Sequence, residues 1–369
     1  MKNRKLNIRS ITIKVGSNVL TKDDGSLDIC RIEHLTRQIG WLHKQGIRVV
    51  LVSSGAIAAG RKIVKDAAAK EPVSQRQLLS AVGQVKLVNI YSSFFEKQNI
   101  TCAQVLVTKQ DFSSREHYLN MKNCFSVLLD NNIIPVVNEN DAVSVTALMF
   151  TDNDELAGLV ASMMDTDALF ILTNVDGIYS GVPGQEGAEL IPEIKEGRDD
   201  PKDFILHTKS DFGRGGMLTK CRVAQKTAAS GIAVFIANGM RDNIIIDLVE
   251  QTKDVPHTWF IPNGRRPAIK KWMAYADGFA KAEVVINRGA RDALTGPKAR
   301  SLLLVGVVAF KDDFKKGDLL RIKDEEGQLI GIGRAQYDRA VAMKHLTDEK
   351  YKPLVHYDYL FIYPNVYKL

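Results

Sequence analysis

Five segments of the chain combine lysines, carboxylates, small polar residues and glycines in patterns that suit phosphate chemistry. They are KVGSN at 14–18, SSGA at 53–56, NENDA at 138–142, TDNDE at 151–155 and GRGGMLTK at 213–220. Backbone N–H groups at a helix start bind phosphate, and glycine permits close approach. Lysines neutralise a phosphoryl group in transfer, while carboxylates hold Mg²⁺ or orient those lysines. The set therefore predicts phosphoryl transfer.

The residue types that these segments lack narrow the acceptor group. None of the seven histidines lies in them, and no cysteine is paired with a base. This argues against acyl transfer and against a histidine general base. An acceptor that is already ionised at neutral pH, such as a carboxylate with a pKa of about 4.3, needs no proton removed. A carboxylate acceptor fits best.

Three familiar motifs match these segments only superficially. A Walker A loop ends in Gly-Lys-Ser/Thr, whereas Lys220 here follows Leu218 and Thr219. The DFG at 211–213 has no HRD catalytic loop upstream, which a protein kinase requires. The acidic run that starts at Asp152 has Ala157 where a calcium-binding EF-hand needs glycine. The segments therefore need an interpretation of their own.

Each segment also has a purely structural interpretation. A lysine at a strand end commonly terminates the strand in solvent, and an Asp before a helix commonly caps it, which stabilises the helix by about 1 kcal/mol. Glycines before a helix commonly make turns. What favours a chemical role is the combination, because all five segments lie at the same edge of one predicted sheet.

The elements that must position these segments are recognisable in residues 1–258. Apolar runs rich in β-branched residues predict strands at 10–15, 47–52, 102–108, 133–138, 168–173 and 232–237. Longer patterns with apolar residues at three-to-four spacing predict helices between them, at 28–45, 77–98 and 113–132. Strand-helix alternation implies a largely parallel sheet with helices on both faces. Ligands of such folds bind at the carboxyl ends of the strands.

The sequence changes character after Trp259. Residues 260–278 are basic and interrupted by Pro and Gly, as in a linker, and short strand candidates follow. They predict a β-rich barrel or sandwich of about 90 residues. All of the +7 net charge lies here, since residues 259–369 hold 20 Lys+Arg and 13 Asp+Glu. The surplus suits either affinity for a polyanion such as RNA or a solvated, basic accessory domain.

The general composition is that of a globular protein with two domains. Hydrophobic residues make up 45% of the 369 and charged residues 25%. We find no apolar run of about 20 residues that would span a bilayer. The polar start predicts no signal peptide, and four scattered cysteines without a CxxC predict a reducing compartment. The expected location is the cytoplasm.

Taken together, the motifs resemble the amino acid kinase superfamily, and more narrowly its glutamate 5-kinase family. The matching segments are KVGSNVL at 14–20, SSGAIAAGR at 53–61, NENDAV at 138–143, DNDELAGLVA at 152–161, LTNVDGIY at 172–179 and GRGGMLTK at 213–220. The C-terminal part resembles a PUA domain in RGA at 288–290, SLLLVGV at 301–307 and GIGRA at 331–335. The resemblance covers nearly the whole chain, and the order kinase-then-PUA is itself specific.

The resemblance implies a fold and a reaction. The fold is a three-layer α/β/α amino acid kinase domain with a mainly parallel sheet (1–258), a linker (259–277) and a small β-rich PUA barrel (278–369). The reaction transfers a phosphoryl group from ATP, with Mg²⁺, to the side-chain carboxylate of L-glutamate. Its product is L-glutamyl 5-phosphate, the first step of proline biosynthesis.

Roles for individual residues also follow from the resemblance. Lys14 and Lys220 would stabilise the phosphoryl group in transfer, and Asp154 would hold both lysines in place. L-glutamate would be bound by Ser54, Asp141, Asn153, Asn138 and Asp152. ATP would be contacted by Lys14, Thr173, Asn174, Arg214, Gly215, Gly216, Met217, Leu218, Thr219 and Lys220. No protein ligand for the metal is implied, and Mg²⁺ would be held mainly by the ATP phosphates.

Three positions on the nucleotide side depart from the family pattern. Arg214 stands where the family commonly has Thr, Leu218 where it has a small polar residue, and Asn174 where it has Asp. A guanidinium at position 214 would bind phosphate bidentately in place of the lost hydroxyl.

The resemblance further implies particular partners. They are a second copy of the chain in a homo-oligomer (a dimer or tetramer), proline as a feedback inhibitor, and functional coupling to glutamyl phosphate reductase. Two rival functions stay open on the sequence alone. One is another small-molecule kinase of the superfamily, and the other is an RNA-binding or RNA-modifying protein acting through the PUA domain.

Overall fold

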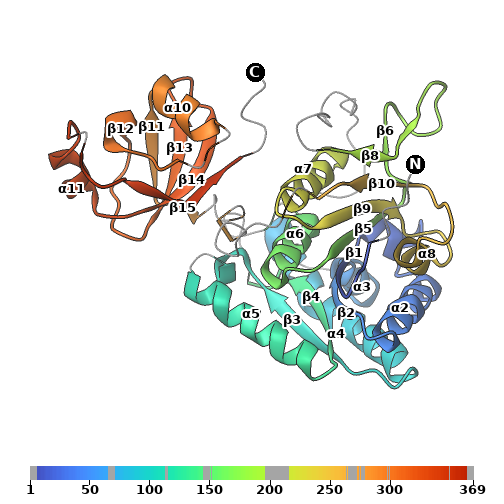
Figure 1. Cartoon of the computed structure of the whole chain (residues 1–369). Helices are drawn as coiled ribbons and strands as arrows, with labels where there is room; N and C mark the ends of the chain where they lie inside the picture. The colour runs from blue at the N-terminus through green and yellow to red at the C-terminus, as the bar shows by residue number, and fades with distance from the viewer. Residues whose placement is uncertain are drawn as a thin grey trace. The chain divides into compact units, whose positions relative to one another are not determined.

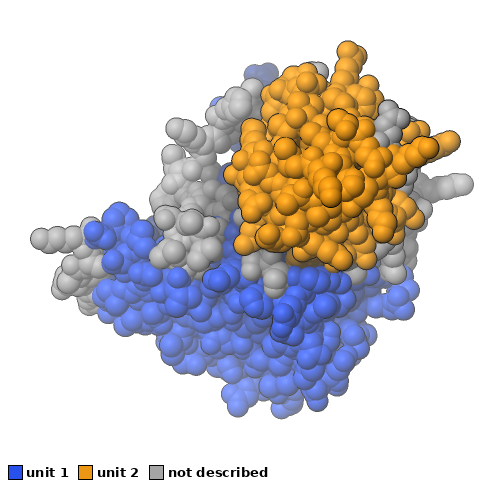
Figure 2. All heavy atoms as spheres, turned by 90° about the vertical axis from the view of Figure 1, so that its left-hand side faces the viewer, with its two compact units in different colours: residues 1–265 blue, residues 266–369 orange. Residues whose placement is uncertain are grey.

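The chain forms two compact units, residues 1–265 and 266–369 (Figure 1; Figure 2). The structure, a computed structural model, describes residues 6–64, 71–112, 115–143, 150, 152–195, 216–262, 264, 272–273, 275, 279–296, 298, 300–348 and 350–363. Strand β10 (His257–Phe260) belongs to the sheet of the first unit. The expected boundary after residue 258 therefore falls within a strand.

The first unit is built on an eight-stranded sheet in the order β3-β4-β2-β1-β5-β9-β10-β8. Six of its strands run parallel: β1 (Ser10–Val15), β2 (Arg48–Ser53), β3 (Cys102–Val107), β4 (Ile134–Glu139), β5 (Ala168–Thr173) and β9 (Ala233–Asn238). β10 pairs antiparallel with β9, and β8 (Glu193–Ile194) pairs parallel with β10. A mainly parallel sheet, as the sequence predicts, is confirmed.

The strand order places a switch point at β1. The chain passes from β1 to its neighbour β2, while β5 pairs along the opposite side of β1. Every residue of β4 and β5 is buried, which explains why residues 134–137 and 168–172 are continuous apolar runs rather than alternating ones. In open α/β sheets, ligands bind beyond the carboxyl ends of the strands at such a switch point. The site is therefore expected around the ends of β1, β2 and β5.

Helices cover both faces of this sheet (Figure 1). α2 (Ile29–Lys44), α3 (Ala56–Ile63), α4 (Pro72–Glu96) and α8 (Ile244–Glu250) share one apolar core with Ile11, Ile13 and Val15 of β1. α5 (Arg115–Asp130), α6 (Asn153–Met164) and α7 (Met217–Ala228) lie on the other face. Because strand side chains alternate, Lys14 points to the α6 face while its two neighbours enter the first core. Within the described residues, no helix is both long and apolar enough to cross a membrane.

Two glycines let α3 and α4 pack backbone to backbone. A Cβ atom on Gly60 would overlap the carbonyl of Leu79, and one on Gly83 would overlap the carbonyl of Ala56. Such contact leaves no room for a side chain, so it fixes α4 along α3. Since α3 starts at the carboxyl end of β2, the first half of α4 is held beside the edge of the sheet where the site is expected.

The second unit has its own sheet and core. Its five strands lie in the order β12-β11-β13-β14-β15, with only β11 and β13 parallel. The short helices α10 (Arg288–Thr295) and α11 (Arg339–Lys344) accompany them. The predicted β-rich second domain is confirmed. Its strands are β11 (Ala282–Ile286), β12 (Val307–Phe310), β13 (Leu319–Asp324), β14 (Leu329–Ala335) and β15 (Val355–Ile362).

Candidate active site

A buried carboxylate joins the two lysines that were predicted to be catalytic. Asp154, in the first turn of α6, is completely buried. Lys14 Nζ lies 2.6 Å from its Oδ1 atom, and Lys220 Nζ lies 2.8 Å from its Oδ2 atom. These three residues come from β1, α6 and α7, so the fold assembles the trio from segments far apart in the sequence. Their catalytic role stays a prediction.

Asp154 is held in its charged form by its two partners. Burial by itself would raise the pKa of the Asp154 carboxyl, but the charges and hydrogen bonds of Lys14 and Lys220 outweigh it and lower the pKa to about 2. The two ammonium groups that Asp154 holds suit the oxygens of a phosphoryl group.

Asp152 caps α6 and faces the same cluster. One of its oxygens accepts hydrogen bonds from the backbone N–H groups of Asp154 (2.8 Å) and Glu155 (3.1 Å). Its Oδ2 atom is buried without a hydrogen-bond partner among the described residues. Burial, followed by the charge of Asp154, raises the pKa of Asp152 to about 6 against the pull of both lysines. Asp152 therefore does cap α6, and its Oδ2 atom is available to a ligand or a water molecule.

Three of the residues predicted to bind substrate form a hydrogen-bonded group. Asn153 Nδ2 donates to Ser54 Oγ at 3.0 Å and to Asn138 Oδ1 at 3.1 Å. Ser54 follows β2 and Asn138 lies near the end of β4, the next strand in the sheet. Gly55 turns the chain from β2 into α3 with a φ of 106°, a conformation that favours glycine. The SSGA turn thus places Ser54 beside the amides.

Asp141 lies in the turn after β4 and is held from α4. The Arg76 guanidinium donates to Asp141 Oδ1, and Ser80 Oγ lies 3.5 Å from Oδ2. Arg76 Nη2 is also 3.6 Å from Glu139 Oε2. Burial raises the pKa of Asp141, and Arg76 partly opposes that rise. Asp141 is therefore a buried carboxylate whose charge depends on an arginine that sequence reasoning missed.

Arg76, Ser80 and Gln84 form a row on α4 that was not predicted. Gln84 Oε1 accepts a hydrogen bond from Asn138 Nδ2 at 2.8 Å, so all three side chains reach the end of β4. The signal was present in the sequence, because polar residues at four-residue spacing share one face of a helix. It is weak, because polar positions of this spacing more often face solvent.

Apart from Lys14 on β1, the predicted nucleotide contacts that the structure describes lie at the carboxyl end of β5 and at the start of α7. Thr173 is the last residue of β5, and its hydroxyl donates to Asn174 Oδ1 at 3.3 Å. Gly216 is the N-cap of α7, and Met217, Leu218 and Thr219 form its first turn together with Lys220. The start of this helix therefore presents backbone N–H groups beside a catalytic candidate. Two further predicted contacts, Arg214 and Gly215, lie outside the described residues.

A second group that sequence reasoning missed lies beside Thr173. Arg241 grips Asp176 with two hydrogen bonds, from Nε at 2.7 Å and from Nη2 at 2.8 Å, and Asn238 Nδ2 donates to the same carboxylate at 3.0 Å. The hydrogen bonds from Arg241 lower the pKa of Asp176. Asn238 pairs with Thr173 across β9 and β5. These hydrogen bonds connect the loop after β5 to the loop after β9. Because Asp176 and Arg241 are 65 residues apart in the sequence, no local sequence pattern predicts the contact.

The donor set leaves little for a metal ion. Both oxygens of Asp154 are occupied by lysines, and Asp152 Oδ2 is the carboxylate oxygen beside them without a partner among the described residues. In the part of the chain that the structure describes, no group of three or more His, Cys, Asp and Glu residues could hold a metal ion. A single available carboxylate oxygen is compatible with a Mg²⁺ ion that takes most of its ligands from substrate phosphates and water.

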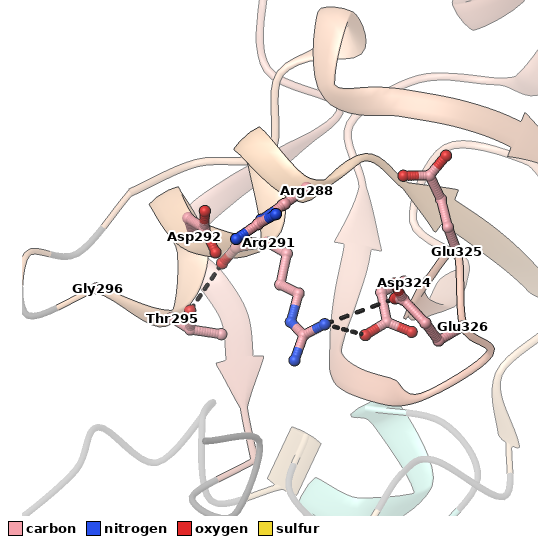
Figure 3. A pocket seen from close by; sticks show the side chains of 8 residues that line it. All are labelled: Arg288, Arg291, Asp292, Thr295, Gly296, Asp324, Glu325 and Glu326. Carbon is pink, nitrogen blue, oxygen red and sulfur yellow. Dashed lines mark hydrogen bonds and ion pairs between the residues drawn. The ribbon is translucent and has the colours of Figure 1, made fainter. Parts of the chain in front are cut away.

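A separate hollow lies on the second unit, between α10 and the turn after β13 (Figure 3). Arg291 points into it, and its Nη1 atom lies 3.0 Å from Asp324 Oδ2 and 3.5 Å from Glu326 Oε2. The arginine is therefore neutralised by its neighbours. None of the residues predicted to do chemistry lines this hollow, so the candidate active site is assigned to the sheet edge. The lining residues are Arg288, Arg291, Asp292, Thr295, Gly296, Asp324, Glu325 and Glu326.

Glu139 makes the stability of the first unit depend on pH. It is 3% exposed, accepts a hydrogen bond from the Phe150 N–H, and burial raises its pKa from 4.5 to about 7. Between these values the folded state holds a proton that the unfolded state has lost. The contribution of Glu139 to stability is therefore complete below pH 4.5 and is lost as the pH rises through about 7. The loss amounts to at most about 3 kcal/mol.

The Glu139→Gln variant is expected to remove this dependence. Urea unfolding at pH 5, 6, 7 and 8 should show the stability of the wild type falling relative to the variant as the pH rises. Glu96→Gln is the matched control, because Glu96 is exposed on α4. A difference between wild type and Glu139→Gln that stays constant from pH 5 to 8 would contradict the prediction.

Comparison with known proteins agrees with this geometry. The amino acid kinase family matches residues 10–238, and the PUA domain matches residues 282–351. A glutamate 5-kinase of Bacteroides thetaiotaomicron is 51% identical over 353 residues, covering 95% of this chain and 98% of the relative. A glutamate 5-kinase of Chlorobaculum tepidum is 46% identical, covering 96% and 98%.

A more distant curated relative gives the same result. A glutamate 5-kinase of Streptococcus pneumoniae is 34% identical, with 97% of both chains covered. Among solved structures, UMP kinase from Ureaplasma parvum aligns with 69% of this chain and 100% of its own, at 16% identity and a TM-score of 0.48. The full-length curated relatives carry the assignment, and the chain belongs to the glutamate 5-kinase family, a PUA-containing branch of the amino acid kinases.

Proposed function

We propose that the protein transfers the γ-phosphoryl group of ATP to the side-chain carboxylate of L-glutamate and forms L-glutamyl 5-phosphate, the first step of proline biosynthesis. The observation that carries the proposal is Asp154 buried between Lys14 and Lys220, at 2.6 and 2.8 Å, beside the switch point of the sheet. Full-length similarity to glutamate 5-kinases supports this choice of substrate.

The two lysines act on the phosphoryl group in transfer. Each ammonium group is an N–H donor, and Asp154 holds both groups together at the place where the phosphoryl oxygens would bind. A glutamate carboxylate oxygen forms the new O–P bond with its own electron pair. The bond to the β–γ bridging oxygen breaks, and its electron pair stays on ADP. Because the attacking group is already ionised, no general base is needed.

Mg²⁺ bound with ATP supplies further charge neutralisation at the phosphates. Asp152 is the residue that would reach it or a water molecule in its shell, through the oxygen that the cap of α6 does not use. Asp154 orients the lysines instead, because both of its oxygens are taken.

Glutamate is recognised at the ends of β2 and β4. Ser54 Oγ accepts a hydrogen bond from Asn153, which leaves the serine hydroxyl proton for the α-carboxylate of the substrate. Asp141 is the carboxylate that matches the α-ammonium group. Asn138 fixes Asn153, and Asp152 completes the set at the start of α6. ATP lies on the other side of the lysines, against Thr173, Asn174 and the start of α7, with Arg214 and Gly215 from the segment before it.

The proposal extends to the domains and the partners. We assign residues 1–260 to the catalytic domain, because β10 ends at Phe260, residues 261–277 to a linker and residues 278–369 to the PUA domain. The division between the two compact units, after residue 265, lies inside this linker. Family membership supports a cytoplasmic homo-oligomer that proline inhibits and that is coupled to glutamyl phosphate reductase.

An ADP-release assay with a panel of acceptors tests the function. We expect turnover with L-glutamate and at least about a hundredfold lower kcat/KM with aspartate, acetylglutamate and carbamate, because each lacks a group that the buried polar site would pair. Adding proline should lower the rate with glutamate. Turnover only with an acceptor other than glutamate would overturn the proposal.

A further inference from the structure

One face of α4 is polar although the helix is buried against the first core. Arg76, Ser80 and Gln84 lie at four-residue spacing, and each of them contacts a residue at the end of β4. The Arg76 side chain is only 16% exposed. We propose that Arg76 is a positioning residue that sets the affinity for the amino acid substrate by acting through Asp141. The inference rests on the proposed function, in which Asp141 binds the α-ammonium group.

The geometry divides the two oxygens of Asp141 between different tasks. Arg76 donates to Oδ1, whereas Ser80 reaches Oδ2 only at 3.5 Å, the long limit of a hydrogen bond. With respect to the described residues, Oδ2 therefore keeps most of its capacity to accept a hydrogen bond. Arg76 fixes the orientation of the carboxylate, and the remaining oxygen is the one that a substrate ammonium group would meet.

The charge balance at the end of β4 requires the same arginine. Glu139 and Asp141 are both buried carboxylates, and the Arg76 guanidinium contacts both of them. Glu155 is the next acidic group, and Lys109 lies 3.7 Å from it. Without Arg76, the charge and hydrogen bond that oppose the effect of burial on Asp141 would be lost, and the pKa of its carboxyl would rise further. A protonated Asp141 would not attract an ammonium group.

The position of Arg76 predicts which kinetic constant it controls. It comes from α4 and contacts Glu139 at the end of β4 and Asp141 in the turn that follows, whereas the lysine cluster joins β1, α6 and α7. Its loss should therefore weaken binding of the amino acid and leave the transfer step and the nucleotide largely unaffected. A residue needed only for folding would not separate these constants.

Steady-state kinetics of Arg76→Met and Arg76→Lys test the inference. Arg76→Met is expected to raise the KM for glutamate by about 10- to 100-fold, while the KM for ATP and kcat stay within about threefold. Arg76→Lys keeps the charge but has fewer donors, so it should recover most of the loss. Lys86→Ala is the matched control, because Lys86 is an exposed cation on the same helix.

Each outcome decides the question. A KM for glutamate within about twofold of the wild type in both variants would overturn the inference, and so would a parallel rise of the KM for ATP. If Arg76→Met fails to fold, as judged by circular dichroism, Arg76→Lys carries the test with an expected rise of about 3- to 10-fold for glutamate alone. A wild type that does not use glutamate would overturn the proposed function itself, which is a different result.

Discussion

Lys220→Ala is expected to lower kcat by about a thousandfold, with smaller changes in the KM for ATP and glutamate. Lys220 Nζ lies 2.8 Å from the buried Asp154, and its side chain is 12% exposed, so its charge acts where water does not screen it. As the transfer proceeds, the negative charge is redistributed among the oxygens around the phosphorus atom in the transition state. A cation held in place by Asp154 stabilises this transition state without having to reorganise, and the alanine substitution removes that cation entirely.

Circular dichroism and an ADP-release assay at saturating substrates check this result. Arg222→Ala is the matched control, because Arg222 is an exposed cation two residues further along α7. It should keep kcat within about twofold. A folded Lys220→Ala protein with a kcat within about tenfold of the wild type would reduce the start of α7 to a structural turn.

The parts of the fold that the sequence predicts well are those with a strong local pattern. Continuous apolar runs predicted the buried strands because burial on both faces demands such runs, and Ala168–Thr173 was found at the expected residues. Asp28 and Gly46 bracket α2 as a cap and a positive-φ stop. Lys14 and Lys220 could be assigned to one site because both lie at the edge where parallel strands end. The inferences about strands and caps depend on neighbours within a few residues, and the inference about the lysines depends on the rule that parallel strands end at one edge of the sheet.

What could not be predicted depends on contacts between distant segments. The row of Arg76, Ser80 and Gln84 becomes meaningful only when the glycines of α3 and α4 bring it to the end of β4. The hydrogen bonds from Arg241 to Asp176 connect two loops at positions 65 residues apart in the sequence. Spacing along the chain cannot distinguish such residues from solvated surface. The resemblance of the motifs predicted the reaction and its residues, and the structure identified the further residues that contact them.

Asp154→Asn is expected to be as damaging as the loss of Lys220, although it leaves the shape of the side chain almost unchanged. The carboxylate is completely buried and holds one ammonium group on each oxygen. An amide offers one acceptor and one donor, so one of the two lysines would face an N–H group and be left without a partner. Removing one partner from a buried ion pair costs about 3–5 kcal/mol of stability. Asp130→Asn is the matched control, since Asp130 belongs to an exposed pair with Arg48.

The decisive measurement is the double variant of Asp154→Asn with Lys220→Ala. If Asp154 acts by holding the lysines, each single change should lower kcat by about a thousandfold, and the double change by little more than either alone. Independent roles would instead multiply to about a millionfold. Urea unfolding separates the effect on catalysis from the effect on stability. The Asp154→Asn variant leaves both cations buried, so its free energy of unfolding should fall further than that of the double variant, which lacks one of them. Multiplicative losses in kcat would show that Asp154 has a task of its own, apart from the two lysines.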